Sequence, residues 1–180
     1  YLTKEGDSYL GGTDNSPMLS TNSLIHDSRV VKLVLELLNL SYFTGSELEH
    51  ENKQRGSFNN RTGNIPDAVL LGKKDEQKFR VALELELTRK TKTRYLAKAG
   101  QYLNTTYYDF VIYFFQSKSL LESYKKNIDE KFGTDSNTKI IYAYNEKLFL
   151  KGFDFMESRI IFLNRKGDFS TIFGEPIEVH

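Results

Sequence analysis

The sequence has no cysteine, no tryptophan and only three prolines among its 180 residues. Without cysteine the chain can form no disulfide framework, no thiol nucleophile and no thiolate zinc site. The longest apolar runs, such as Phe110–Phe115, are too short to cross a bilayer. The first residues also lack the charged and then apolar pattern of a signal peptide. We therefore expect a cytoplasmic protein that does not enter the membrane.

Aromatic surface and a local run of bases are present instead. Thirteen Phe and eleven Tyr supply the apolar area for the core of one domain. The formal net charge is only +1, but it is unevenly spread, because no acid lies between Leu87 and Tyr108. The bases of that segment are Arg89, Lys90, Lys92, Arg94 and Lys98. Such a local positive segment is what contact with a polyanion requires.

Hydrophobic periodicity predicts an α/β fold with a mixed central sheet flanked by helices. Apolar residues crowd residues 30–40 so densely that we expect a helix buried around much of its circumference, packed against the sheet and capped by Asn22-Ser23 or Asp27. The other predicted elements are an extended piece at 41–49 with Tyr42 and Phe43 in the core, a mobile loop at 50–64, strands at 68–71 and 79–87 around a turn at 72–77, a helix from Thr91 or Thr93 to Asn104, a buried central strand at 109–116, a helix at 119–131, a strand at 139–144, and short strands or turns at 147–155, 159–164 and 169–173.

Three acids are expected to meet on the hairpin of residues 68–87. Side chains alternate along a strand, so Glu84 and Glu86 point to the same face. Asp67, after Pro66, arrives from the neighbouring strand. Three carboxylates form the oxygen-lined environment that Mg²⁺ or Mn²⁺ prefers, and such an ion can activate water and stabilise charge on a phosphate.

Each of these motifs also has a structural interpretation. Pro-Asp before a strand is commonly a turn, and two Glu on one strand face are usually solvated. A run of bases is more often a helix surface than a nucleic-acid groove. Their order along the chain favours the site: helix, Pro-Asp, strand, Glu-x-Glu, basic helix, buried strand.

This order resembles the PD-(D/E)xK nuclease superfamily. The core of that superfamily is a helix, three strands, a helix and a strand, with Asp on the second strand and a Glu-x-Lys pair on the third. Asp67 matches the Asp and Glu84 the Glu. Glu86 stands where the superfamily usually has Lys, a variant that some restriction endonucleases share.

A closer resemblance covers most of the chain. Its motifs are similar to those of the replication-relaxation family of plasmid proteins and of the related MobC mobilisation relaxases. The motifs are His26-Asp27, Ser46-Glu47, Pro66-Asp67-Ala68, Glu84-Leu85-Glu86-Leu87-Thr88-Arg89-Lys90 and Arg94-Tyr95. The resemblance implies that residues 1–20 are a linker left from an upstream winged-helix domain, that 21–116 form the nuclease-like core, and that 117–180 are an extension packed on the same domain.

The resemblance also implies a function. The chain would be a Mg²⁺- or Mn²⁺-dependent DNA-nicking endonuclease that acts at a plasmid transfer or replication origin, together with other mobilisation or replication proteins. The metal ligands would be Asp67, Glu84 and Glu86, with Glu47 as a fourth, while Lys90 and Arg94 contact phosphate. The alternative is a non-catalytic module of the same fold that binds DNA or protein, because Glu86 replaces the usual Lys.

Two further assignments stay open at this point. His26 either belongs to the start of the buried helix or reaches the site. Tyr107 and Tyr108 could suggest a tyrosine that attaches covalently to DNA, but the His-hydrophobe-His metal motif of such relaxases is missing. We expect both tyrosines in the core or at its rim.

Overall fold

A computed structural model describes residues 21–48 and 65–173 of the chain. The predicted linker at 1–20 and the predicted loop at 50–64 lie outside these residues. The elements, in chain order, are α2 (Thr21–Leu38), β1 (Phe43–Leu48), β2 (Ala68–Lys74), β3 (Gln77–Glu86), α4 (Lys92–Asn104), β4 (Phe110–Phe115), α5 (Lys118–Phe132), the 3₁₀ turn η1 (Thr134–Thr138), β5 (Ile140–Tyr144), β6 (Arg159–Phe162), β7 (Arg165–Asp168) and α6 (Phe169–Phe173). Among the residues described, no helix has the length and apolar character needed to span a bilayer.

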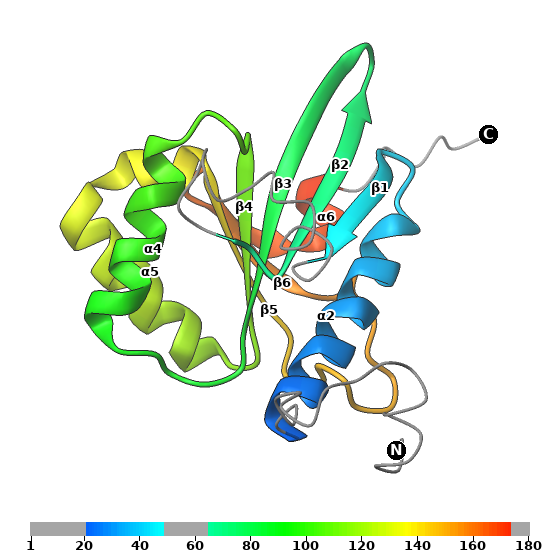
Figure 1. Cartoon of the computed structure of the whole chain (residues 1–180), viewed down its shortest axis with the longest axis horizontal. Coiled ribbons are helices and arrows are strands. Elements are labelled where there is room, and N and C mark those ends of the chain that lie inside the picture. Colours follow the sequence, from blue (N-terminus) through cyan, green and yellow to red (C-terminus); the bar gives the residue numbers. More distant parts are fainter. Residues whose placement is uncertain (1–20, 49–64, 174–180) are drawn as a thin grey trace, which may run out of the picture.

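All seven strands belong to one sheet, in the same order as in the chain. The pairs β1–β2, β2–β3, β5–β6 and β6–β7 are antiparallel, whereas β3–β4 and β4–β5 are parallel. Each parallel pair is connected through a helix, α4 or α5, because parallel neighbours need a crossover. The predicted mixed sheet flanked by helices is thus confirmed, and β4 has the expected central place (Figure 1).

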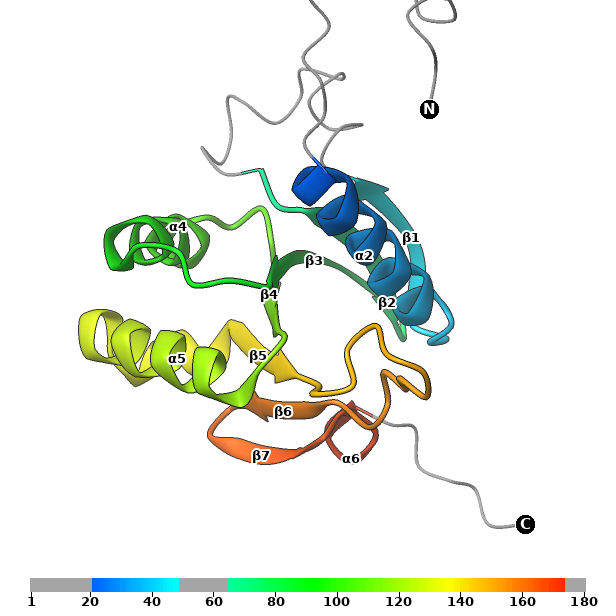
Figure 2. The same ribbon diagram turned by 90° about the horizontal axis from the view of Figure 1, so that it is seen from below.

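The helices form layers on both faces of the sheet. Figure 2 shows α4 and α5 on one face and α2 on the other. The face under α4 and α5 is rich in tyrosine, including Tyr102, Tyr108 and Tyr113, which are all buried. The opposite core contains α2, alternate aliphatic residues of β2 and β3 such as Leu70 and Leu83, and Phe155 and Phe169 from the C-terminal part. The placement of Tyr108 in the core is therefore confirmed.

The helix α2 differs from its prediction in two respects. It is buried on one face only, through Val30, Leu33, Val34 and Leu37, while Leu24, Ile25, Val31 and Leu35 are exposed. The prediction of burial around much of the circumference is therefore wrong. The helix packs against the sheet on one side only, so a single apolar stripe is enough. The helix also begins at Thr21, so the proposed caps Asn22, Ser23 and Asp27 lie inside it.

Smaller corrections concern the ends of the predicted elements. The hairpin strands extend further than expected, since β2 reaches Lys74 and β3 begins at Gln77, with a turn of two residues between them. Thr91 is the N-cap residue of α4, but its side chain makes no capping hydrogen bond. Residues 169–173 form the short helix α6 rather than a strand or turn.

The one-sided burial of α2 gives a prediction on stability. Leu33→Ala should lower the free energy of unfolding by about 2–5 kcal/mol, because the side chain is fully buried and its loss leaves a cavity. Leu35→Ala on the same helix should change it by less than about 0.5 kcal/mol, since Leu35 is 59% exposed. Urea unfolding of both variants measures the difference, and equal losses would contradict the described orientation of α2.

Candidate functional site

Glu84 and Glu86 lie on β3, in the middle of the sheet. Their neighbours in the parallel register are Tyr113 and Phe115 on β4, so both carboxylates point to the face that α4 and α5 cover. Their exposed fractions are 0% and 1%. The prediction that both point the same way is confirmed, and the solvated-face interpretation is wrong. Buried carboxylates require partners.

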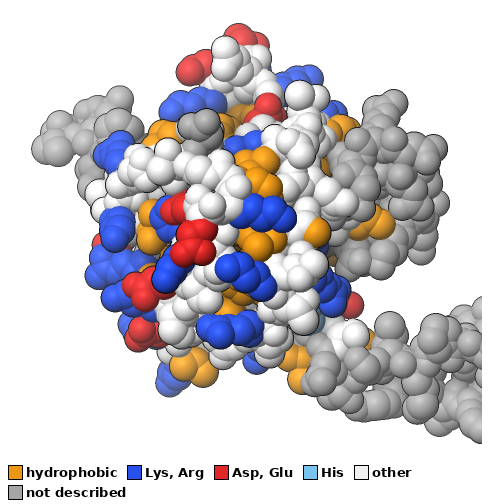
Figure 3. Space-filling view, turned by 90° about the vertical axis from the view of Figure 1, so that its left-hand side faces the viewer, with side chains coloured by type: hydrophobic (Ala, Val, Ile, Leu, Met, Phe, Trp, Pro, Cys, Tyr) orange, Lys and Arg blue, Asp and Glu red, His pale blue; other side chains and the backbone are white. Residues whose placement is uncertain are grey.

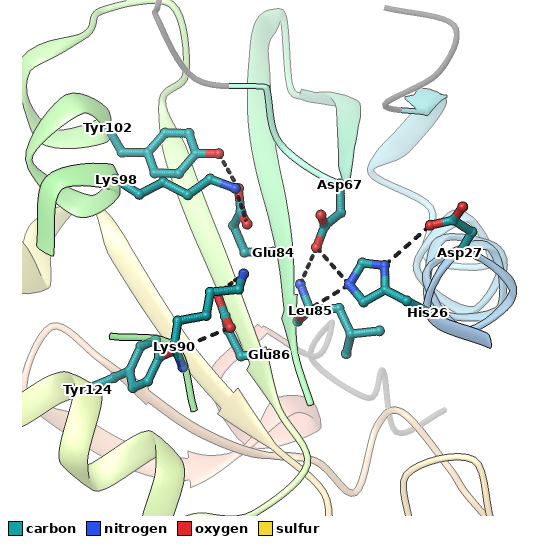
Figure 4. A network of polar contacts seen from close by, with 10 residues as sticks. All are labelled: His26, Asp27, Asp67, Glu84, Leu85, Glu86, Lys90, Lys98, Tyr102 and Tyr124. Carbon is teal, nitrogen blue, oxygen red and sulfur yellow. Dashed lines mark hydrogen bonds and ion pairs between the residues drawn. The ribbon is translucent and has the colours of Figure 1, made fainter. Parts of the chain in front are cut away.

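The partners of Glu84 come from α4. Lys98 Nζ lies 2.6 Å from Glu84 Oε2, and the hydroxyl of Tyr102 donates to Glu84 Oε1. Lys98 and Tyr102 are four residues apart, and such residues lie one above the other on a helix face. The polar and the aromatic side chain of one helix turn thus meet the same carboxylate (Figure 4).

Glu86 has a second base and a second tyrosine. Lys90 Nζ lies 2.8 Å from Glu86 Oε1, and the hydroxyl of Tyr124 on α5 lies 3.3 Å from Glu86 Oε2. The same hydroxyl accepts the backbone N–H of Lys90 at 3.1 Å. The ring of Tyr124 stacks on Tyr95 of α4 with 3.9 Å between centroids, so this contact also joins the two helices.

Asp67 sits where β2 begins and meets α2. The register Ala68↔Leu83 places Asp67 opposite Glu84 across the β2–β3 pair. Asp67 Oδ2 accepts the backbone N–H of Leu85 at 2.7 Å and lies 3.5 Å from His26 Nε2. The same ring nitrogen is 3.2 Å from the carbonyl of Leu85. His26 therefore reaches the site, which decides between its two interpretations.

Burial and pairing shift the pKa values of these groups in different directions. Burial, supported by the charge of Asp67, raises the pKa of Glu84 to about 7 against the opposing effect of Lys98. Burial also raises the pKa of Glu86. Burial would raise the pKa of Asp67 too, but hydrogen bonds from His26 and the Leu85 N–H hold it below its ordinary value. The hydrogen bond to Asp67 raises the pKa of His26 to about 9.

The site balances three acids with three bases. His26, Lys90 and Lys98 lie within ion-pair distance of Asp67, Glu86 and Glu84, respectively. Within residues 21–48 and 65–173, no three His, Asp or Glu side chains form a group that could hold a metal ion. The described arrangement therefore does not gather the predicted metal ligands, because each carboxylate faces its own base.

Glu47, the predicted fourth ligand, is further from the others. It lies on β1 opposite Val69, so β2 separates it from Glu84 on β3. Two strand spacings amount to about 10 Å. Glu47 is half-buried and lies on the same face of the sheet as Glu84.

The five predicted DNA-binding bases fall into two groups. Lys90 and Lys98 are turned inward to the carboxylates, as described above. Arg89, Lys92 and Arg94 are exposed in the β3–α4 connection and the first turn of α4. Figure 3 shows Lys and Arg side chains, with acids between them, on the side of the molecule where α4 and α5 lie.

Two site residues and one contact were not assigned from the sequence. Tyr102 could have been found, since it follows Lys98 by one helical turn. Tyr124 carries no such signal, because its position depends on how α5 packs beside α4. The link between His26 and Asp67 joins residues 41 positions apart on a helix and a strand end, and no local pattern predicts it.

Comparisons of the chain with protein-family models, with curated proteins and with solved structures find no match. The relationship to plasmid relaxases therefore stays a prediction. The site has to be judged from its own geometry and charges.

The pKa of His26 gives a pH-dependent prediction. Because the folded-state pKa of about 9 lies above the ordinary 6.5, protonated His26 stabilises the fold fully below 6.5, and this contribution is lost as the pH rises through 9. An NMR titration of the His26 ring should show a midpoint near 9. In Asp67→Asn the midpoint should move towards 6.5, and an unchanged midpoint would contradict the pairing with Asp67.

The pair of Lys98 and Glu84 gives a prediction on stability. Lys98→Met leaves Glu84 buried without its base and should lower the free energy of unfolding by about 3–5 kcal/mol. Below about pH 7 the folded state keeps Glu84 protonated, so the carboxyl needs its base less. The destabilisation by Lys98→Met should therefore grow as the pH rises through about 7 and Glu84 becomes charged. Urea unfolding at about pH 5 and pH 8 measures it.

Lys92→Met is the matched control. Lys92 is exposed and lies 3.8 Å from the exposed Glu130, so its replacement should change stability by less than about 0.5 kcal/mol at either pH. Equal effects of the two substitutions would show that the Lys98–Glu84 pair does not hold the site together.

Proposed function

We propose that the chain is a divalent-metal-dependent DNA endonuclease that nicks one strand, acting in plasmid mobilisation or replication. The observation that carries the proposal is the buried carboxylate of Glu84, with Asp67 opposite it on the neighbouring strand and the ammonium of Lys98 bonded to it. Exposed bases at the same end of β3 supply contacts for the DNA backbone.

The order of elements supports a PD-(D/E)xK-like core. The chain runs α2, β1, β2, β3, α4, β4, which is the succession of helix, three strands, helix and strand that the resemblance implies. Asp67 directly precedes the second of these strands, and Glu84 stands on the third. The positions of Asp67 and Glu84 along the chain therefore support the proposed core, while the usual lysine is replaced by Glu86.

Lys98 can take the role of the lysine that the motif lacks at position 86. Glu86 occupies the position two residues after Glu84 where a lysine is usual, but an ammonium group reaches Glu84 from α4 instead. Lys98 would stabilise negative charge on the phosphate that is cut, because it is held beside the carboxylate pair.

The chemical type of the donor atoms, rather than their grouping in the described arrangement, suits a hard divalent cation. Asp67 and Glu84 would hold Mg²⁺ or Mn²⁺, since oxygen ligands with excess negative charge suit both ions. Such an ion supplies an activated water and a positive charge at the scissile phosphate. An ion held by Glu84 would share that carboxylate with the ammonium of Lys98. Arg89, Lys92 and Arg94 would position the duplex through its phosphates.

One observation favours a second candidate, a non-catalytic module that binds DNA or a partner protein. Each of the three carboxylates already faces a base, so the acids of the site have partners without any ion. A site of this kind can be retained for stability alone, because buried acids and bases must be paired.

A nicking assay separates the two candidates. Incubation of a supercoiled plasmid that carries its own transfer or replication origin with the protein and Mn²⁺ should give open circles. Asp67→Asn should reduce the nicking rate by about 100-fold or more, because it removes a charged ligand while the amide oxygen can still accept the Leu85 N–H.

Asp27→Asn is the matched control, since Asp27 is an exposed acid on the other side of His26. It should nick like the wild type. Absence of nicking by the wild type, together with no heat of Mg²⁺ or Mn²⁺ binding in calorimetry, would overturn the enzyme proposal and favour the binding module.

A further inference from the structure

The hairpin of β2 and β3 extends beyond the rest of the sheet. Pairing of β2 with β1 ends at Gly72, and pairing of β3 with β4 begins only at Val81. Residues 73–80, which we call the ribbon, form the outer end of this hairpin, and in the strand register they pair only with other residues of β2 and β3. Figure 1 shows this hairpin rising past β1 and β4. All ribbon side chains except Phe79 are exposed.

The ribbon is stiffened at its base on both faces. On one face the ring of Phe79 lies over Gly72, where an added Cβ would come within 2.2 Å of it, and also contacts Phe43 edge-on. On the other face the guanidinium of Arg80 lies 4.8 Å from the ring centre of Tyr107. The side chain of Asp109 accepts the backbone N–H of Arg80 at 2.7 Å. The ribbon is thus an anchored arm.

One face of this arm is basic. Lys73 and Lys78 are directly opposite each other in the register, and Arg80 follows two residues later on the same face. Like charges placed opposite each other destabilise a strand pair unless an anion lies between them. The turn acid Glu76 reaches only Lys73, at 3.2 Å, and its side chain is 94% exposed, so this pair is weak.

We infer that the basic face of the ribbon, Lys73, Lys78 and Arg80, binds the phosphate backbone of double-stranded DNA. Side chains on one strand face recur every 6.8 Å or so, which is close to two base-pair steps along one DNA strand. This inference deepens the proposed function, because it adds a second contact to the substrate at the opposite end of β3 from Arg89, Lys92 and Arg94. The two contacts lie about 27 Å apart along the strand, which is roughly eight base pairs.

The test measures binding without metal, so that its outcome is independent of catalysis. Fluorescence anisotropy in EDTA follows a labelled duplex of about 20 base pairs as the salt concentration changes. The variant Lys73→Gln/Lys78→Gln/Arg80→Gln should bind about tenfold or more weakly at about 0.1 M salt. Its slope of log K against log salt should be shallower by about 2.7, because three phosphate contacts are lost.

The matched control replaces two lysines and one arginine that are exposed in β7 and in the connection between β5 and β6. Lys151→Gln/Arg165→Gln/Lys166→Gln changes the net charge equally and should keep the wild-type slope. Lys73→Arg/Lys78→Arg, which retains the charges, should bind like the wild type. Thermal unfolding checks that the variants are folded, since all the replaced side chains are exposed.

Three results would overturn the inference: wild-type protein that does not bind the duplex, a ribbon variant with the wild-type slope, or equal losses in the ribbon variant and the control. Binding of poly-glutamate that depends on the ribbon, with unchanged duplex binding, would also overturn it and indicate an acidic protein partner. If the wild-type protein does not nick the plasmid with Mn²⁺ but its duplex binding depends on the ribbon as expected, the result contradicts the proposed function and leaves the inference standing.

Discussion

The buried carboxylates of Glu84 and Glu86 on β3 need partners on the face of the sheet that α4 and α5 cover, and the arrangement of these helices meets this requirement. Glu84 is paired by Lys98 and Tyr102 from one helix, and Glu86 by Lys90 and the Tyr124 hydroxyl from the β3–α4 connection and the other helix. Removing one partner of a buried ion pair lowers the free energy of unfolding by several kcal/mol, because the other charge is left buried without a partner. The position of α4 on the sheet is thus fixed by charge as well as by apolar packing.

Asp67 extends the same network to the opposite layer. It accepts the Leu85 N–H at the point where β2 begins, and His26 of α2 bonds both to it and to the Leu85 carbonyl. Groups from both helical layers therefore converge on three consecutive residues of β3, from Glu84 to Glu86. A change of charge at Asp67 changes the pKa of Glu84 on the other face, because the charge of Asp67 raises that pKa.

The sequence allowed the local features of this site to be predicted but not its pairing. Strand alternation placed Glu84 and Glu86 on one face, and the buried run at 110–115 indicated a central strand. The pairing of Lys98 with Glu84 depends on how far α4 is rotated over the sheet, which periodicity does not fix. Lys98 was therefore predicted only as one base of the positive segment that contacts a polyanion. The exposed apolar side of α2 was missed for a similar reason, because a dense apolar pattern does not say which face is covered.

The protruding ribbon has a consequence for how the fold can vary. Its outer pairs, Lys73 with Lys78 and Lys74 with Gln77, lie beyond the pairing of β2 with β1 and of β3 with β4, so equal insertions or deletions in both strands there leave the core untouched. Removing or adding two residues on each strand keeps every remaining side chain on its own face and moves the tip by about 7 Å. A change of one residue would reverse the faces. The length of the hairpin can therefore change in steps of two residues per strand while the rest of the molecule stays the same.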